Sequence, residues 1–298
     1  MVCKRSLRTE EAGAALLSLL PAALVFLVFT AFPLAYSLYL SFHDWSLLTP
    51  ARTFIGLENY RKILASPAAE NAFRVTILYA TGSIPLLLLS SLGLALLLQR
   101  RMRSGSLYRT ALFAPAVLST AVTGLIWSWA FEPYSGLINS LLRRLGLNGP
   151  SWLADPQWAL PALIIATVWQ YAGYYMVIFL AGLRTIPESY YEAARLDGAG
   201  KFRQFWSLTL PLLRKTIAFL LVLATLNSFQ TFGLVYVLTG GGPMDSTNLV
   251  VNYLYREAFE FFRMGYASAI AWLLAIFLFA LALLQVRLIG WGSRLRGD

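Results

Sequence analysis

Cysteine and histidine are nearly absent from this sequence, and their scarcity excludes several kinds of chemistry. Cys3 is the only cysteine and His43 the only histidine, so an internal disulfide is excluded. A zinc cluster or a histidine-based catalytic site has almost no residues to use. The phosphate-binding pattern G-x-x-x-x-G-K-[ST] is also missing, because the glycine run 240–242 lacks the lysine. If ATP powers this protein, another chain binds it.

Charged residues are scarce as well. They make up 13% of the 298 residues, against about a quarter in an average soluble domain. Hydrophobic residues make up 58%, and the mean hydropathy is +0.63, which indicates a membrane protein with several spans. A net charge of +10 would suggest nucleic acid as a partner of a soluble protein. In a membrane protein the basic residues collect on the cytoplasmic side, so we expect a lipid bilayer and no nucleic acid.

Six apolar segments are long enough to cross a hydrocarbon core of about 30 Å, which takes roughly 20 helical residues. The first follows Lys4, Arg5 and Arg8 in the manner of a signal peptide, but its apolar run is too long for one, so we expect an uncleaved span. The sequence predicts an all-α integral membrane protein with a single domain over residues 1–298. The predicted spans are about 12–40, 73–98, 109–131, 158–183, 212–238 and 264–286.

The distribution of basic residues predicts the orientation. If both termini face the cytoplasm, the 24 Lys and Arg divide into 16 on that side, 7 on the other, and Arg74 at a span edge. Because basic residues favour the cytoplasmic side, this bias places both termini and the loop 185–211 in the cytoplasm.

The interiors of the six predicted spans contain no Asp, Glu, Lys or His. Ion-coupled carriers usually need such a group within the membrane to bind the proton or cation. Its absence disfavours a proton-coupled carrier. An ion-coupled secondary carrier remains the alternative, since backbone carbonyls can bind sodium without an acidic side chain.

The loop 185–211 is the only long charged segment between two strongly apolar ones. Thr185 with Glu188, and Ser189 with Glu192, each form the pattern of a capping box, which predicts a helix that starts near residues 186–189. Gly198 follows Asp197 and predicts the end of this helix, because glycine accepts the left-handed conformation.

A second amphipathic helix is predicted after the glycine. Its apolar stripe would contain Phe202, Phe205 and Trp206, and Pro211 would lie in the first turn of the next span. A helix on the lipid surface would explain these aromatic residues and the neighbouring bases. It would leave the acidic residues of the first helix unexplained, because the inner leaflet repels them. A protein partner explains them better.

The spacing in this loop resembles a known motif. Binding-protein-dependent ABC importer permeases carry the pattern E-A-A-x3-G-x9-I-x-L-P, and this sequence departs from it only at Leu208, where isoleucine is usual. The matching residues are Glu192, Ala193, Ala194, Gly198, Leu210 and Pro211. A second stretch resembles the sugar-permease branch of that family, the maltose and glycerol-3-phosphate type. It comprises Leu238, Thr239, Gly241, Gly242, Pro243, Ser246 and Thr247, followed by Tyr255, Ala258, Phe259, Gly265, Tyr266, Ala267 and Ala269.

The resemblance implies a type I ABC importer permease fold of six helices in a bacterial or archaeal plasma membrane. It implies a second homologous permease, two ATP-binding subunits that hold ATP and Mg, and an extracytoplasmic solute-binding protein. The chain itself would then be no enzyme, and it would carry no cofactor. The helix 188–196 would be the coupling helix, seated on one ATP-binding subunit. The implied ATPase-coupling residues are Glu188, Glu192, Ala193, Ala194, Asp197, Gly198 and Pro211.

Amide and hydroxyl side chains within two spans mark a candidate path for the solute. Asn227, Gln230 and Thr231 lie at helical spacing in the fifth span, and Gln170 and Tyr174 in the fourth. Amides are costly in hydrocarbon and tend to face a wet cavity. Beside aromatic faces they suit a sugar. The alternative is that they only hydrogen-bond neighbouring helices. Which of the two permeases supplies the solute contacts also stays open.

Overall fold

The computed structural model describes residues 18–49, 51–99 and 105–294, with side chains as far as residue 288. Its chain divides into two compact units. One contains the described residues up to Ala65 together with Leu254–Leu273, and the other contains Ser66–Tyr253 and the described residues from Leu274 onward. We describe each unit by itself, and the prediction of a single domain over residues 1–298 stays a prediction.

The apolar segments form long helices, because in hydrocarbon a helix satisfies its backbone groups within its own segment. Within the described parts of the chain, four helices are long and apolar enough to cross a membrane: Ser18–Ser41, α4 (Pro67–Leu98), α8 (Pro156–Arg184) and Met264–Leu288 of α15 (Met264–Arg294). Two bent helix pairs raise the number to six if each pair is one span. The predicted all-helical membrane fold is confirmed.

The first predicted span, 12–40, begins at residues that lie outside the described part of the chain. From Ser18 its helix contains one π-helical turn, η1 (Leu27–Ala31), and continues as α2 (Phe32–Ser41). The predicted spans 73–98, 158–183 and 264–286 lie within α4, α8 and α15, respectively.

The predicted span 109–131 is wrong as a continuous helix. The chain forms α5 (Gly105–Phe113), a 3-10 turn η2 (Ala114–Val117) that contains Pro115, and α6 (Thr120–Ala130), with a bend of 99°. Proline lacks an N–H to continue the helix, and Ser119 starts the new one because its side chain accepts a hydrogen bond from the amide of Val122 at 3.3 Å.

The predicted span 212–238 is also interrupted. Helix α12 (Arg214–Phe229) ends before a break at residues 230–232, and α13 (Gly233–Leu238) follows. At the other end, a bend of 66° separates α12 from the helical segment Lys201–Leu212.

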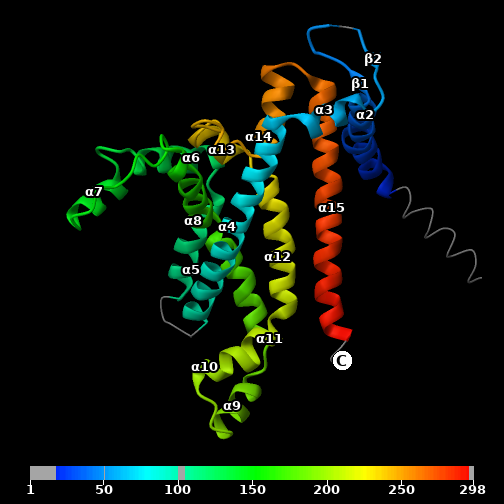
Figure 1. Ribbon diagram of the computed structural model, residues 1–298. Coiled ribbons are helices and arrows are strands. Elements are labelled where there is room, and N and C mark those ends of the chain that lie inside the picture. Colours follow the sequence, from blue (N-terminus) through cyan, green and yellow to red (C-terminus); the bar gives the residue numbers. More distant parts are fainter. Residues whose placement is uncertain (1–17, 50, 100–104, 295–298) are drawn as a thin grey trace, which may run out of the picture. The chain divides into compact units, whose positions relative to one another are not determined.

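The second unit is built on α4, α8 and α12, whose ribbons run side by side in Figure 1. Their shared core contains fully buried Tyr175, Phe179 and Leu183 of α8 and Leu220 of α12, together with Leu213. Helix α5 crosses α8 at Gly173, where a Cβ atom would overlap the carbonyl oxygen of Leu112. This unit also contains α7 (Leu137–Arg144), the helices of the loop 185–211, the start of α14 (Val250–Tyr255) and the part of α15 from Leu274 onward.

The first unit contains a small ordered loop. Strands β1 (His43–Asp44) and β2 (Thr53–Phe54) pair antiparallel, and α3 (Glu58–Ala65) follows. Asn59 is buried and donates hydrogen bonds to the carbonyls of Ser41 and His43, at 2.9 and 3.0 Å. His43, the single histidine, packs on Tyr39 with 4.1 Å between ring centres, so its contacts are structural.

The π-helical turn η4 (Arg256–Glu260) in the same unit holds a buried carboxylate. Glu257 forms an ion pair with Arg263 at 2.6 Å.

We predict that the Gly173→Ala variant loses about 1–3 kcal/mol of stability, because the added methyl group forces the backbones of α5 and α8 apart. Thermal unfolding of the purified full chain measures the effect. Gly93→Ala in α4 is the matched control, since a Cβ atom there meets nothing within 4 Å. Its effect should stay within about 1 kcal/mol. Equal melting temperatures for the two variants would contradict the close crossing.

Candidate functional site

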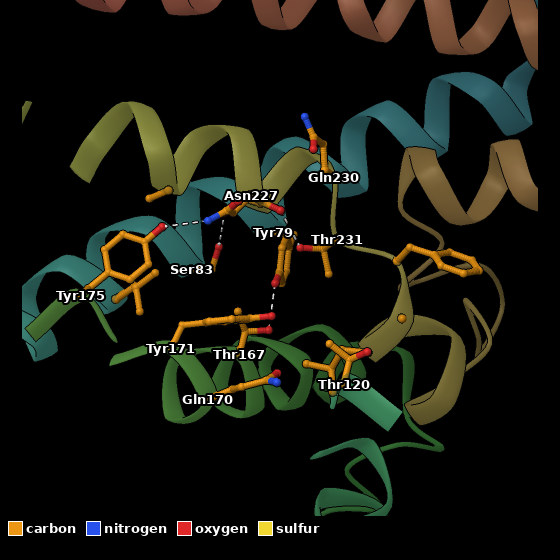
Figure 2. Close-up of a pocket in the computed structure, with 16 residues that line it drawn as sticks. Tyr79, Ser83, Thr120, Thr167, Gln170, Tyr171, Tyr175, Asn227, Gln230 and Thr231 are labelled. Atoms are coloured by element: carbon orange, nitrogen blue, oxygen red, sulfur yellow. Dashed lines mark hydrogen bonds between the residues drawn. The ribbon is translucent and has the colours of Figure 1, made fainter. Parts of the chain in front are cut away.

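A polar cavity of about 330 Å³ lies in the second unit, between α4, α8 and the ends of two interrupted spans. Figure 2 shows side chains from all these elements turned toward a common space. Polar and aromatic groups dominate its lining. They are Tyr79, Ser83, Thr120, Thr167, Gln170, Tyr171, Tyr175, Asn227, Ser228, Gln230 and Thr231.

Helical spacing aligns the polar groups of α4 and α8. Tyr79 and Ser83 are one turn apart on α4, and their hydroxyls form hydrogen bonds with hydroxyls of neighbouring helices. The hydroxyl of Tyr79 lies 2.8 Å from that of Thr167 on α8, and the hydroxyl of Ser83 lies 3.3 Å from that of Ser228 on α12. These bonds fix the walls of the cavity relative to one another.

Both interrupted spans turn their breaks toward the cavity. The carbonyl of Leu118, just after the η2 turn, accepts a hydrogen bond of 3.3 Å from Nε2 of Gln170. At the second break, Gly233 lies against Thr120, whose hydroxyl would be 2.6 Å from a Cβ atom at that position. Irregular backbone at membrane depth is tolerated where protein buries it or where it lines a watery cavity.

Gln170 and Asn227 give the cavity both hydrogen-bond donors and acceptors. Gln170 is 1% exposed, and within the described part of the chain its Oε1 has no hydrogen-bond partner. Asn227 donates to the hydroxyl of Tyr175 at 3.2 Å, and its amide is otherwise exposed (Figure 2). A buried carbonyl oxygen without a partner is costly, so a bound hydroxyl group or water there would be stabilised.

The structure brings together only some of the residues predicted for the solute path. Gln170, Asn227 and Thr231 line the cavity, and in Figure 2 Thr231 points toward Tyr79. Gln230 belongs to the lining, but its amide points away in that view, because α12 ends one residue earlier at Phe229.

Tyr174 lies outside the cavity. It is 39% exposed and contacts Phe113 with 6.4 Å between ring centres. The inward face of α8 contains Thr167, Gln170, Tyr171 and Tyr175, and position 174 is turned away from it.

Sequence reasoning missed most of the hydroxyl groups. Ser83 and Thr167 carry a weak signal, because a Ser or Thr hydroxyl can also form a hydrogen bond with a carbonyl of its own helix. Thr81 does so with Ile77 and is exposed. Tyr79, Tyr171 and Tyr175 carry a weak signal because tyrosine rings also pack in a helical core. The signal that could have identified these residues is the recurrence of hydroxyl side chains every four residues along α4 and α8.

The helix predicted for the loop at 188–196 is present as α9 (Glu188–Leu196), and its coupling role stays a prediction. The predicted capping boxes are wrong. Pro187 occupies the N-cap position without a side-chain bond, and the hydroxyl of Thr185 instead donates to the carbonyl of Gly182 at 2.8 Å, at the end of α8. Ser189 and Glu192 lie inside the helix.

The predicted end of this helix is confirmed. Gly198 has φ of +77°, and the amide of Ala199 donates to the carbonyl of Ala194 at 2.8 Å, which closes the last turn. The second helix comprises α10 (Lys201–Gln204), the π-helical turn η3 (Phe205–Thr209) and α11 (Leu210–Leu212). Pro211 lies in α11, before the 66° bend, so the prediction that it begins the next span is wrong.

One face of the loop is exposed and the other contacts the helical core. Glu188, Glu192 and Asp197 are exposed, as are Leu196 at 89% and Phe202 at 78%. On the inner side, the hydroxyl of Tyr191 lies 3.0 Å from that of the buried Thr209. The loop extends beyond the ends of α8 and α12 in Figure 1.

The loop 185–211 also contributes to the core of the second unit. Its partly buried residues Ile186, Phe205 and Leu210 pack against the core of α4, α8 and α12. Packing contacts therefore connect the loop on both sides of α9 to the spans that enclose the cavity.

Apolar helices long enough to cross a membrane surround a polar cavity, and an exposed helix lies on the loop at one end of them. This arrangement fits a membrane protein that conducts a solute. The chain belongs to the family of binding-protein-dependent transport system inner membrane components, whose model matches residues 14–292. The family resemblance drawn from the loop motif is thereby confirmed.

Relatives with related sequences agree with this assignment. A probable ABC transporter permease protein, YurN of Bacillus subtilis, is 38% identical over 276 residues, which cover 91% of this chain and 94% of YurN. The sulfoquinovosyl glycerol transport system permease protein SmoG of Agrobacterium fabrum is 38% identical over 271 residues, 90% of this chain and 86% of SmoG.

The fold is similar to a chain in the crystal structure of a bacterial ABC transporter involved in the import of the acidic polysaccharide alginate. The TM-score is 0.81 at 23% identity, with 99% of this chain and 100% of that chain covered. The protein is a permease subunit of an ABC importer, and the comparisons give no support to an ion-coupled carrier.

We predict that Asn227→Cys reacts quickly with a hydrophilic thiol reagent, and that Thr225→Cys reacts slowly. Asn227 is exposed in the cavity, whereas Thr225 is buried and accepts a hydrogen bond of 2.8 Å from Gln285. The labelling uses the full chain with Cys3, its only cysteine, changed to Ser. Equal rates at both positions would contradict the location of the cavity.

Proposed function

We propose that this permease moves a sugar, or a related polyol or glycerol derivative, through the cavity enclosed by α4, α8 and the two interrupted spans. The observation that carries the proposal is the unpartnered Oε1 of Gln170, in a lining that also offers the Asn227 amide and several hydroxyls. A sugar presents many hydroxyl groups and flat C–H surfaces, which suit amides beside tyrosine rings. The similarity to the SmoG permease of a sulfoquinovosyl glycerol transport system supports this substrate class.

The transport cycle requires other subunits. A permease of this family works with a solute-binding protein. We infer the remaining partners from the ABC importer class: a second homologous permease and two ATP-binding subunits. ATP and Mg would be bound and ATP hydrolysed on those subunits, so this chain would not itself be an enzyme. We also propose a bacterial or archaeal plasma membrane as the location, with both termini on the cytoplasmic side.

The exposed face of α9 fits the role of the coupling contact. Its acidic Glu188 and Glu192 and its apolar Leu196 would face an ATP-binding subunit rather than lipid, because anionic headgroups repel carboxylates. Ala193 keeps the contact surface shallow. When the ATP-binding subunits close, α9 would move as a rigid body.

The motion would pass to α12 through the contact of Tyr191 with Thr209. It would reach α8 through Leu213 and Thr216, which lie against Gly182. Both helices line the cavity, so the contact route joins the site of ATP hydrolysis to the solute path.

We predict that Gln170→Ala and Asn227→Ala each weaken transport by about 2–10-fold in kcat/KM. That range corresponds to the loss of one hydrogen bond worth about 0.5–1.5 kcal/mol. Uptake of the solute by membrane vesicles that contain the assembled transporter measures the effect. Tyr174→Ala on the outer face of α8 is the control, and it should leave uptake near the unmodified level. Unchanged uptake in both cavity variants would remove the proposed solute path.

A pair of glycine variants tests the coupling helix. Gly198→Val places a β-branched residue at φ of +77°, a strained conformation that should disturb the end of α9. Gly200→Val is the matched control, because its φ of −67° suits any residue and nothing lies near its Cβ position. We expect only the first variant to lose ATP hydrolysis stimulated by the solute-binding protein. Stimulation that survives in both would refute the coupling role.

A further inference from the structure

A second hollow, away from the solute cavity, lies between α5 and the C-terminal half of α8. It has a volume of about 480 Å³ and is open along one side. Its lining consists of Arg109, Thr110, Phe113, Val177, Leu180, Ala181 and Arg184. We call this hollow the arginine groove. It belongs entirely to the second unit and shares no lining residue with the solute cavity.

The groove is amphipathic along its length. Helical spacing places Val177, Ala181 and Arg184 on one face of α8, and Arg109 and Phe113 on one face of α5. The apolar residues lie toward the crossing of the two helices at Gly173, and Arg184 is the last residue of α8. The groove is therefore apolar toward the crossing and cationic at its end beside the loop.

The charges of the two arginines are the next feature of the groove. Within the described residues, neither forms an ion pair. Arg109 donates one hydrogen bond from Nη2 to the carbonyl of Leu98 at 3.1 Å. Its Nε is buried and has no hydrogen-bond partner among the described residues. Arg184 is exposed. Two cations that line one groove favour an anion between them.

We propose that the arginine groove binds an anionic phospholipid. Its phosphate would accept hydrogen bonds from the two guanidinium groups, which are suited to bidentate contacts with phosphate oxygens. One acyl chain would lie against Phe113, Val177, Leu180 and Ala181. Basic pockets between membrane helices at the cytoplasmic side commonly hold anionic headgroups.

The location of the groove links this lipid to the coupling loop. Arg184 directly precedes Thr185, whose hydroxyl closes α8, and α9 begins at Glu188. A lipid held on Arg184 would fix the end of α8 from which the loop departs. The occupancy of the groove would then affect the loop without contact to the solute.

The experiment measures lipid binding to the full chain within its assembled transporter, by native mass spectrometry in detergent. The probes are phosphatidylglycerol, phosphatidylcholine with the same acyl chains, and inorganic phosphate. We expect phosphatidylglycerol to bind more tightly than phosphatidylcholine. Arg184→Gln should weaken its binding about fivefold, and the double variant with Arg109→Gln about 30-fold, at about 1 kcal/mol for each charge.

Two further variants test whether binding depends on the arginines of the groove in particular and on its apolar surface. Arg144→Gln removes an exposed arginine on α7, outside the groove, and should leave phosphatidylglycerol binding unchanged. Ala181→Trp keeps both arginines but fills the apolar part, and it should weaken binding. Because Ala181 and Arg184 are exposed, these substitutions should not disturb folding, whereas Arg109 also holds the Leu98 carbonyl.

Three outcomes would overturn the proposal. Phosphatidylglycerol binding could be unchanged in the double variant. Inorganic phosphate could compete as well as the lipid and be insensitive to Ala181→Trp, which would identify a site for free phosphate. Cross-linking from Ala181→Cys could capture a second permease, which would mean that a protein covers the groove.

Discussion

Backbone hydrogen bonding in an apolar medium is the constraint on which this structure depends. A span cannot leave amide or carbonyl groups exposed to hydrocarbon, so uninterrupted helices carry most of the chain across. Two of the interruptions meet at the polar cavity, where the first residues of α6 and α13 form part of its lining. There Gln170 satisfies the carbonyl of Leu118, and Gly233 allows the two breaks to approach closely. Interrupted helices thus make a polar site within a membrane without charged side chains.

The same packing that closes the cavity also joins it to the loop. Leu213 is buried against α8 beside Gly182, and Tyr175 on α8 is bonded to Asn227 on α12. The loop contributes Phe205 and Leu210 to this core and keeps α9 outside it. A helix that is exposed on one face and tied by Tyr191 on the other can transmit a displacement without being part of the solute path. Under the proposed coupling role, the permease would respond to ATP hydrolysis on another subunit without nucleotide entering its cavity.

The sequence allowed the helical class, the approximate spans and the limits of α9 to be predicted, because hydrophobic length and the glycine at 198 are local signals. It did not predict the breaks near Leu118 and Gln230. Pro115 and Ser119 are a local signal for the first break, but prolines are tolerated within membrane helices, so whether the helix breaks there depends on tertiary contacts. Gln170 from a distant helix supplies the hydrogen bond that makes the first break tolerable. The spacing of Thr185 and Glu188 predicts that Thr185 caps α9. Its hydroxyl instead donates a hydrogen bond to the end of α8, and the same local sequence is compatible with both arrangements. Tyr174 and Tyr175 are adjacent, and only the packing of α8 decides that Tyr175 faces the cavity.

In the proposed mechanism, the exposed face of α9 contacts an ATP-binding subunit and moves the spans. Single cysteines placed along α9 in a chain free of Cys3, followed by cross-linking in the assembled transporter, test it most directly. We expect efficient cross-links to an ATP-binding subunit from Glu192→Cys and Leu196→Cys, because both positions are exposed. Tyr191→Cys, which faces Thr209, should give few. Equal cross-linking from all three positions, or no ATP-binding subunit captured from any of them, would contradict the account.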